Sequence, residues 1–322
     1  MRGAVDLTGK RVWVAGDRGM VGSALCRRLG AEACDLIVAS RTELDLRDQA
    51  ATAAWMERSR PDIVFVAAGR VGGIAANASM PADFLYDNLM IAANIIHSAH
   101  RIGVEKLLYL GSSCIYPRET AQPIREEQLL TGAFEPTNEG YAVAKIAGIK
   151  LVESFARQHH CRFISALPCN LYGPNDNFDP EKSHVLPALI RKFHEAKVEG
   201  APTVTIWGSG RPRREFLYVD DLVDACMLAM RHYDGPGPIN IGAGADLPIA
   251  DLAALVGEVV GYRGRMVFDT SRPDGTPRKL LDTSRIRKLG WHPKVDLRQG
   301  IAESYRFWAD SFAGRNAVVA GA

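Results

Sequence analysis

The chain has 322 residues, of which 47% are hydrophobic and 24% are charged, and its formal net charge is +2. This length is ample for one large domain or two moderate domains with a full hydrophobic core. The near-neutral charge and the lack of a basic run argue against a nucleic-acid partner, and no apolar stretch is long enough to span a membrane. An N-terminus without the apolar core of a signal peptide predicts a cytoplasmic protein.

The six cysteines form no Cys-x-x-Cys pair and no cluster with the spacing of a metal site. We therefore expect thiols in a reducing compartment, most of them packed in the core, and no bound metal. Cys114 stands apart because it follows the end of a predicted strand.

The first predicted strand, residues 11–15, runs into Gly16, Gly19 and Gly22 and then into a helical pattern. Three glycines at this spacing between a strand and a helix are typical of a dinucleotide-binding loop. Gly16 permits the tight turn, Gly19 lets the backbone approach a pyrophosphate, and Gly22 lets the helix pack against the strand. The helix N-terminus then offers free N–H groups to the phosphates. The alternative interpretation is an ordinary turn.

The second predicted strand, residues 36–40, is followed by Arg41 and lacks the terminal carboxylate that binds the adenine ribose in NAD-specific folds. Arg41, together with Arg18 of the glycine loop, suits a 2′-phosphate through charge-assisted hydrogen bonds. This strand end therefore predicts NADP as the cofactor. The alternative is that both arginines are merely exposed.

The order of the elements indicates the fold. Strands are predicted at residues 11–15, 36–40, 62–68, 107–110 and 162–167, with helical patterns between them. This alternation predicts a Rossmann-type, doubly wound parallel sheet, and the irregular pattern after it predicts a smaller mixed α/β substrate-binding lobe. We place the NADP-binding domain at residues 1–172, with returning segments at about 217–245. The substrate-binding lobe then comprises residues 173–216 and 246–322.

Within the second half, residues 203–221 are expected to form a strand and a loop, and residues 249–260 a helix. The last helix is predicted near residues 298–311. Residues 315–322 are expected to be a fraying tail.

The most informative stretch runs from a predicted strand to a predicted helix. Ser112 and Cys114 follow the end of the strand, and the helix carries Tyr141 and Lys145 one turn apart on the same face. A lysine ammonium beside a tyrosine favours the phenolate, which predicts a lowered pKa for Tyr141. A strand-end serine hydroxyl can hydrogen-bond the reacting oxygen. Taken alone, Tyr-x-x-x-Lys also fits an ordinary helix face.

Segments along the whole chain strengthen the catalytic interpretation. They are GDRGMVG, VGGIAAN, LGSSCIYP, EPTNEGYAVAKIAG, NLYGPNDNF, SHVLPALIRKF, WGSGRPRREFLYVDD and PDGTPRKLLD. Together they resemble the GDP-L-fucose synthases, a family of extended short-chain dehydrogenases/reductases, from about Lys10 to Trp308. The resemblance implies NADPH-dependent 3,5-epimerisation and 4-reduction of GDP-4-keto-6-deoxy-D-mannose to GDP-L-fucose. It also implies a homodimer, formed through helices that include the one starting at Tyr141.

The resemblance implies a role for each catalytic residue. Tyr141 matches the acid of the reduction, Lys145 lowers its pKa and binds the ribose, and Ser112 lies near the 4-oxygen. Cys114 and His184 match the base and the acid of the epimerisations, and both side chains exchange protons near neutral pH. The alternatives are a buried thiol for Cys114 and a helix-capping role for His184.

The resemblance also implies two binding sites. The cofactor would be held by Gly16, Asp17, Arg18, Gly19, Met20, Val21, Gly22, Arg41, Leu110, Gly111, Ser112, Ser113, Lys145, Pro168, Cys169, Asn170, Leu171 and His184. The GDP-sugar would be held by Trp207 at the guanine or sugar, by Arg214, Arg265 and either Arg191 or Lys192 at the pyrophosphate, and by Asp274 at the ribose or guanine. The chain departs from some family members at Ala39, where they carry a further arginine.

Two other functions remain open. A related nucleotide-sugar epimerase or dehydratase would keep NAD bound, but a dehydratase is expected to have an acid/base pair where this chain has Ser113 and Cys114. A non-catalytic NADP-sensing protein of the same fold is expected to have lost Tyr141 or Lys145.

Overall fold

We describe the protein from a computed structural model, which covers residues 3–180, 182–272 and 274–320. For Ile74 and residues 312–320 only the backbone is described.

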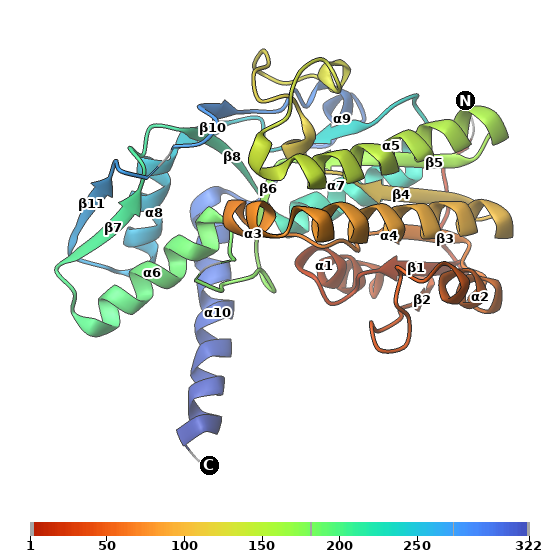
Figure 1. The fold of residues 1–322 in the computed structure, drawn as a ribbon. Helices are drawn as coiled ribbons and strands as arrows, with labels where there is room; N and C mark the ends of the chain where they lie inside the picture. Colours follow the sequence, from red (N-terminus) through yellow and green to blue (C-terminus); the bar gives the residue numbers. More distant parts are fainter. Residues whose placement is uncertain (1–2, 181, 273, 321–322) are drawn as a thin grey trace.

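Among these residues, a six-stranded parallel sheet has the order β2-β1-β3-β4-β5-β9 (Figure 1). Its strands are β1 (Arg11–Ala15), β2 (Asp35–Ile37), β3 (Ile63–Val66), β4 (Lys106–Leu110), β5 (Arg162–Pro168) and β9 (Ile239–Ile241). The chain order reverses between β1 and β3. Ligands of open α/β sheets bind outside the carboxyl ends of the strands at such a point.

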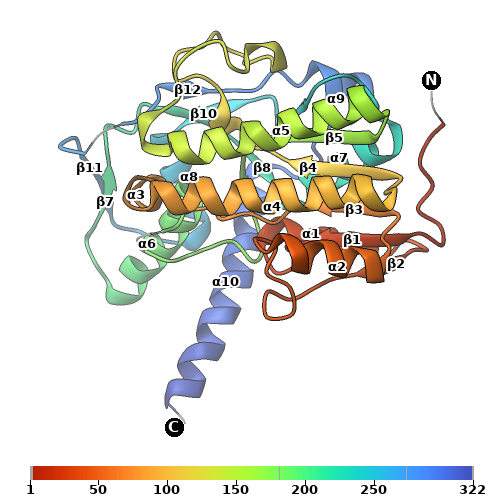
Figure 2. The same cartoon turned by 45° about the vertical axis from the view of Figure 1, so that its right-hand side comes forward.

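Helices cover both faces of this sheet, which confirms the predicted doubly wound fold (Figures 1 and 2). One layer consists of α2 (Gln49–Ser59), α4 (Pro81–Ile102) and α5 (Glu139–His159), and the other contains α1 (Met20–Leu29) and α7 (Val219–His232). The strands between the layers are apolar and almost fully buried, as parallel strands covered on both faces must be.

Short helical turns connect the sheet to the region of the predicted site. They are α3 (Ile74–Ser79) and the 3₁₀ turns η1 (Ser113–Ile115), η2 (Glu126–Gln128) and η3 (Pro136–Asn138). Turn η1 directly follows β4, and η3 leads into α5. The tip of β4 and the start of α5 are thereby brought to the same end of the sheet.

The remaining elements build a smaller part. They are β6 (Asn170–Tyr172), α6 (Val185–Glu199), β7 (Thr203–Trp207), β8 (Arg213–Tyr218), β10 (Asp246–Pro248), α8 (Ile249–Val260), β11 (Arg265–Asp269), β12 (Arg278–Lys279) and α10 (Leu297–Ala320). Helix α9 (Ser284–Lys288) instead packs against β9, and its Ile286 lies in the core around the parallel sheet. Strand β8 pairs with β6, β10 and β12, while β7 pairs with β11. Their apolar side chains form a cluster of their own, including Phe193, Leu252, Val256, Ile301 and Trp308.

Several predicted boundaries are wrong. Strand β2 ends at Ile37 rather than at residue 40, because it is an edge strand and Val38 is already exposed. The predicted loop after β7 contains the central strand β8. The final helix continues to Ala320, so residues 315–320 are helical, and residues 321–322 lie outside the described residues. None of the helices described is long and apolar enough to cross a membrane.

Candidate active site

The three glycines of the first loop lie between β1 and α1, and two of them are required by packing. Gly16 adopts φ +91°, and a Cβ there would lie 2.7 Å from the backbone of Ala68. A Cβ on Gly22 would collide with the Gly16 carbonyl oxygen, so the helix approaches the turn as closely as a glycine allows. Gly19 precedes the first turn of α1, whose N–H groups no side chain caps. This geometry fits a bound pyrophosphate.

The rest of the first loop has mixed exposure. Arg18 is exposed, Asp17 is half-buried, and Met20 and Val21 pack partly against the core. Arg41 follows β2 in a turn and is also exposed. Neither Arg18 nor Arg41 forms an ion pair with a described residue, so both guanidinium groups are available to a phosphate.

The tip of β4 is built around a glycine and a serine. A Cβ on Gly111 would collide with Leu167, so the chain passes close to β5 after Leu110. The Ser112 hydroxyl oxygen then accepts a hydrogen bond from the Cys114 N–H at 3.2 Å, and this bond starts turn η1. Ser113 is buried inside the turn, whereas Cys114 is partly exposed.

Tyr141 and Lys145 lie on one face of α5 beside this tip. The Lys145 ammonium donates to the Leu110 carbonyl at 2.9 Å and lies 5.9 Å from the Tyr141 ring centre. Burial lowers the pKa of Lys145 to about 8, because a buried site disfavours a charged group.

The predicted lowering of the Tyr141 pKa is wrong for this structure. Burial raises the pKa of Tyr141, the nearby Cys114 raises it further, and only the side-chain hydrogen bond with Ser112 lowers it. Desolvation of the phenolate outweighs the favourable contacts. Tyr141 is therefore a protonated phenol at neutral pH, which is the form that donates a proton.

Cys114 lies close to two groups that influence proton transfer. Burial lowers the pKa of Arg214, and the opposite charge of a Cys114 thiolate raises it. Cys114, Tyr141 and Arg214 are therefore electrostatic neighbours, although they come from three separate segments.

His184 directly precedes α6, but its side chain makes no capping hydrogen bond, so the capping interpretation is not supported. Desolvation lowers the pKa of His184. Just upstream, the Lys182 carbonyl accepts a hydrogen bond of 3.2 Å from the Gly73 N–H. The segment that carries His184 is thereby attached to the loop between β3 and α3.

The segment Pro168–Leu171 forms the end of β5 and the start of β6. Cys169 is buried, and burial raises the pKa of its thiol, as expected for an inert core cysteine. The Asn170 side-chain amide donates to the Glu215 carbonyl at 2.8 Å, so it joins β6 to β8.

The predicted substrate residues are only partly brought together. Trp207 is 63% exposed and has two cations near its ring centre, Lys192 at 5.4 Å and Arg272 at 5.0 Å. Arg191 instead pairs with Glu195, so Lys192 is the better placed of the two open alternatives. The sequence motifs gave no indication of Arg272.

Asp274 and Arg265 occupy positions that differ from their predicted roles. Both carboxylate oxygens of Asp274 accept hydrogen bonds from Ser209, at 2.6 Å from its N–H and 2.7 Å from its hydroxyl. Arg265 begins β11, at the opposite end of the β7–β11 pair from Trp207. The structure therefore does not bring Arg265 to the tryptophan.

A buried network behind turn η1 was not predicted from the sequence. The Tyr116 hydroxyl donates to the Asn240 Oδ1 at 2.7 Å, and the Asn240 amide donates to the carbonyls of Ile124 at 2.9 Å and Asp282 at 3.2 Å. Glu126 accepts from the Asn240 N–H at 2.9 Å. This network anchors the turn that carries Cys114, and the long sequence separation of its members left no local signal.

Comparison with known proteins agrees with this geometry. The family model described as "NAD dependent epimerase/dehydratase family" matches residues 12–242. The GDP-L-fucose synthase of Sinorhizobium fredii is 55% identical, covering 95% of this chain and 98% of its own, and that of Escherichia coli is 51% identical, covering 94% and 97%. The chain belongs to the GDP-L-fucose synthases of the NAD dependent epimerase/dehydratase family.

A solved structure of another GDP-L-fucose synthase supports the same relationship. The enzyme from Naegleria fowleri, titled a GDP-L-fucose synthetase bound to NADP, superposes with a TM-score of 0.89 at 28% identity. The match covers 97% of this chain and 98% of that one. The similarity therefore includes the smaller part as well as the parallel sheet.

Proposed function

We propose that this GDP-L-fucose synthase converts GDP-4-keto-6-deoxy-D-mannose to GDP-L-fucose with NADPH. The observation that carries the proposal is the grouping of Ser112, Cys114, Tyr141 and Lys145 at the tip of β4, beside a glycine loop shaped for a dinucleotide. The relatives named above support the same reaction.

NADP is the proposed cofactor, and the residues present fit it. The glycine loop would hold the pyrophosphate, Arg18 and Arg41 the 2′-phosphate, and Lys145 the nicotinamide ribose. When bound, NADPH supplies a hydride to C4 of the sugar. The absence of an arginine at Ala39 leaves Arg41 and Arg18 to provide the preference for NADP over NAD.

The epimerisations need proton removal and return at C3 and C5. The 4-keto group acidifies these protons, and removal of one leaves an enolate whose charge rests on the 4-oxygen. We assign Cys114 as the base and His184 as the acid that returns a proton to the opposite face. The lowered pKa of His184 makes its imidazolium a stronger acid but a less populated one. Ser112 stabilises the charge on the oxygen.

The reduction needs one proton at the 4-oxygen as the hydride arrives at C4. The raised pKa keeps Tyr141 protonated and so able to donate. The Lys145 ammonium near the ring stabilises the phenolate that remains. Solvent then returns a proton to Tyr141.

The GDP portion is proposed to bind in the smaller part. Trp207, with Lys192 and Arg272 beside its ring, suits the guanine or the sugar, and Arg214 suits the pyrophosphate. Asp274 and Arg265 remain weaker candidates because of their observed positions.

We also propose the domain division predicted from the sequence, with one refinement. Residues 1–172 and 217–245 supply most of one buried cluster, and the remaining residues supply most of the second. Leu281, Ile286 and Trp291 pack in the first cluster, so the segment around α9 is assigned to the cofactor-binding domain. A homodimer through α4 and α5 is proposed as well, since both helices expose apolar side chains.

The alternatives differ in cofactor behaviour. A nucleotide-sugar epimerase with tightly held NAD recycles it without net consumption, and a non-catalytic NADP sensor consumes none. We therefore propose to follow NADPH absorbance with and without GDP-4-keto-6-deoxymannose and to identify the sugar product. Oxidation that requires the keto-sugar and yields GDP-L-fucose is expected. Product formation without net NADPH loss would favour the NAD-recycling enzyme.

A further inference from the structure

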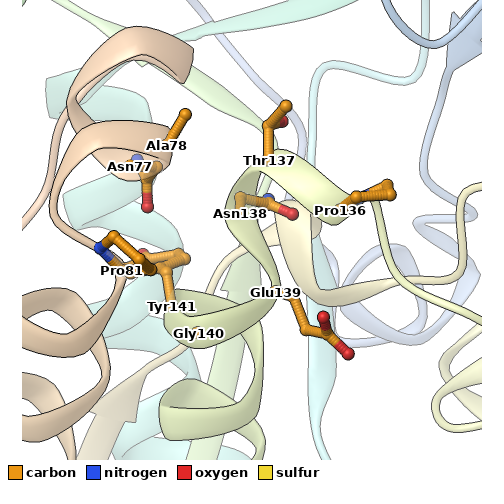
Figure 3. A pocket seen from close by; sticks show the side chains of 9 residues that line it. All are labelled: Asn77, Ala78, Pro81, Pro136, Thr137, Asn138, Glu139, Gly140 and Tyr141. Atoms are coloured by element: carbon orange, nitrogen blue, oxygen red, sulfur yellow. The ribbon is translucent and has the colours of Figure 1, made fainter.

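Tyr141, the proposed acid of the reduction, lies in the wall of a pocket of about 340 Å³ (Figure 3). The lining comes from residues 77–81 and 136–141, which belong to the proposed cofactor-binding domain. None of the described lining residues is basic, so this pocket offers no cation to a pyrophosphate. Arg214, the residue proposed for that role, comes from β8. The reaction therefore requires β8 to be held in place relative to the cofactor-binding domain.

Strand β8 lies between the two hydrophobic clusters. Leu217 packs in the cluster around the parallel sheet, whereas Phe216 and Tyr218 pack in the cluster of the smaller part. Because side chains alternate between the two faces of a strand, Glu215 shares the face of Leu217, and Arg214 lies on the other face. Neighbouring residues of one strand therefore supply the proposed pyrophosphate contact and a contact with the cofactor-binding domain.

The Glu215 side chain is fully buried and joins β8 to two segments that follow much later in the chain. Its Oε1 atom accepts a hydrogen bond from the Gly244 N–H at 2.6 Å, and its Oε2 atom accepts one from the Leu281 N–H at 3.0 Å. A Cβ on Gly242 would collide with the carboxylate, so the loop after β9 packs closely around it. The backbone carbonyl of Glu215 accepts a further hydrogen bond, from the Asn170 side-chain amide at 2.8 Å.

These contacts coincide with the places where the chain passes from one hydrophobic cluster to the other. Four such passages are residues 169–172, 216–217, 243–247 and 268–281, since the first and last residues of each range pack in or against different clusters. Glu215 directly precedes one passage and forms a hydrogen bond with a residue of each of the other three. A single residue therefore links four passages between the cofactor-binding domain and the smaller part.

A glutamate is a costly residue at this position. Burial raises the pKa of Glu215 to about 7, because a carboxylate is disfavoured away from water. Among the described residues no lysine or arginine forms an ion pair with it, and backbone N–H groups are the donors that favour its charged form. Stability alone does not account for such a group. Its two oxygens, however, bind two separate segments at once, which an apolar side chain cannot do.

We propose that Glu215 is a positioning residue that fixes Arg214, and with it the GDP portion, relative to the cofactor and Tyr141. The inference rests on the proposed function and names the residue that holds its two binding sites in register. The carboxylate itself contacts neither ligand. Because a misplacement of about 1 Å between reacting groups can cost about 100-fold in rate, loss of this contact should lower kcat without weakening the binding of either ligand alone.

Glu215→Gln tests the proposal with the size of the side chain unchanged. Its NH₂ group cannot accept a hydrogen bond, so one of the two backbone N–H groups loses its partner. The experiment measures kcat for NADPH oxidation with the keto-sugar, and calorimetry measures the dissociation constants of NADPH alone and of GDP alone. We expect kcat to fall about 100-fold while both dissociation constants change less than about 2-fold.

A second variant and a matched control complete the test. Gly242→Ala displaces the same carboxylate but keeps its charge, and it should give the same result even if Glu215→Gln does not fold. The control, Asp234→Asn, removes a carboxylate that pairs with Lys106 at 3.0 Å and with Arg162 at 2.7 Å. These partners begin β4 and β5, at the end of the sheet opposite the site. The control should lose stability and keep kcat within about 2-fold of wild type.

Three outcomes would count against the inference. An unchanged kcat in both Glu215→Gln and Gly242→Ala would overturn it and leave the proposed function intact. Equal losses in kcat and in the affinities for NADPH and GDP would also overturn it, because they indicate a general structural role. Failure of wild type to oxidise NADPH with the keto-sugar would instead reject the proposed function and the inference with it.

Discussion

Tyr141 and Lys145 are both buried, and burial changes their pKa values in opposite directions. The phenol keeps its proton and the ammonium loses its proton more readily, because each neutral form is favoured away from water. The pair therefore supplies a proton donor beside a cation that is only marginally stable. Burying the charged form of Lys145 therefore lowers the free energy of unfolding. The site keeps this lysine because the proposed reaction uses it.

The variant Lys145→Met tests whether the buried ammonium destabilises the folded protein. The pKa of Lys145 is about 8 in the folded protein and 10.5 for an ordinary lysine, which represents the unfolded chain. Between pH 8 and pH 10.5 the unfolded chain therefore binds more protons than the folded protein. The free energy of unfolding of wild type should therefore rise relative to that of the variant by about 2 kcal/mol between pH 7 and 9.5. Urea denaturation at several pH values measures it.

The control for Lys145→Met is Lys150→Met, because Lys150 is exposed and pairs with Glu153 on the same helix. Its difference from wild type should not change over this pH range. A pH-independent difference for Lys145→Met would contradict the account of a destabilised buried ammonium.

Arg18 and Arg41, both exposed, are the residues proposed to give the preference for NADPH over NADH. Arg41→Ala removes one charge-assisted contact to the 2′-phosphate, which NADH lacks, so NADPH should bind about 10- to 100-fold more weakly while NADH binding is unchanged. Titration of cofactor fluorescence measures both constants. Arg58→Ala, on the exposed face of α2, is the control. An equal loss of affinity for NADPH and NADH would show that Arg41 does not contact the 2′-phosphate.

At the scale of elements, turn η1 depends on contacts made far along the chain. Tyr116 follows the turn, and its hydroxyl satisfies an Asn240 oxygen that is otherwise buried. Asn240 in turn joins η2 to the segment before α9. The position of Cys114 is therefore determined by the folding of the whole cofactor-binding part rather than by its own strand.

Tyr116→Phe keeps the ring and removes this bond. The free energy of unfolding should fall by about 1–3 kcal/mol, because the Asn240 oxygen is left unpaired in the core. Urea denaturation provides the value, and Tyr86→Phe is the control because Tyr86 is 59% exposed. Unchanged stability would mean that the network does not hold the turn.

How well each element was predicted depends on where its determinants lie. Helix α8 has the predicted bounds because Pro248 and the left-handed Gly261 mark its ends locally. Strand β8 was missed because its pairing comes from β6, β10 and β12, which the local pattern does not reveal. The motifs located the glycine loop and the Tyr141–Lys145 face, but only the fold shows Asn240 behind the site and Arg265 away from it.

At the scale of the molecule, α4 and α5 pack side by side and expose Tyr86 and Val143 at 59% and 41%. We expect sedimentation at twice the 35.1 kDa of one chain. Tyr86→Glu combined with Val143→Glu should give single chains, because two charges in an apolar interface cannot be solvated. Val198→Glu on α6 is the control, since Val198 is 71% exposed outside these helices. Dimers that persist in the double variant would place the interface elsewhere.

The central proposal is that Cys114 is the base of the epimerisations and Tyr141 is the acid of the reduction. We would incubate wild type, Cys114→Ser and Tyr141→Phe with the keto-sugar and NADPH in deuterated water, and measure deuterium at C3 and C5 together with NADPH oxidation. Tyr141→Phe should lose about 10²- to 10⁴-fold in oxidation but keep the exchange, since only the reduction acid is removed. Cys114→Ser should lose the exchange and reduce the sugar without epimerising it. Exchange at the wild-type rate in Cys114→Ser would contradict the account.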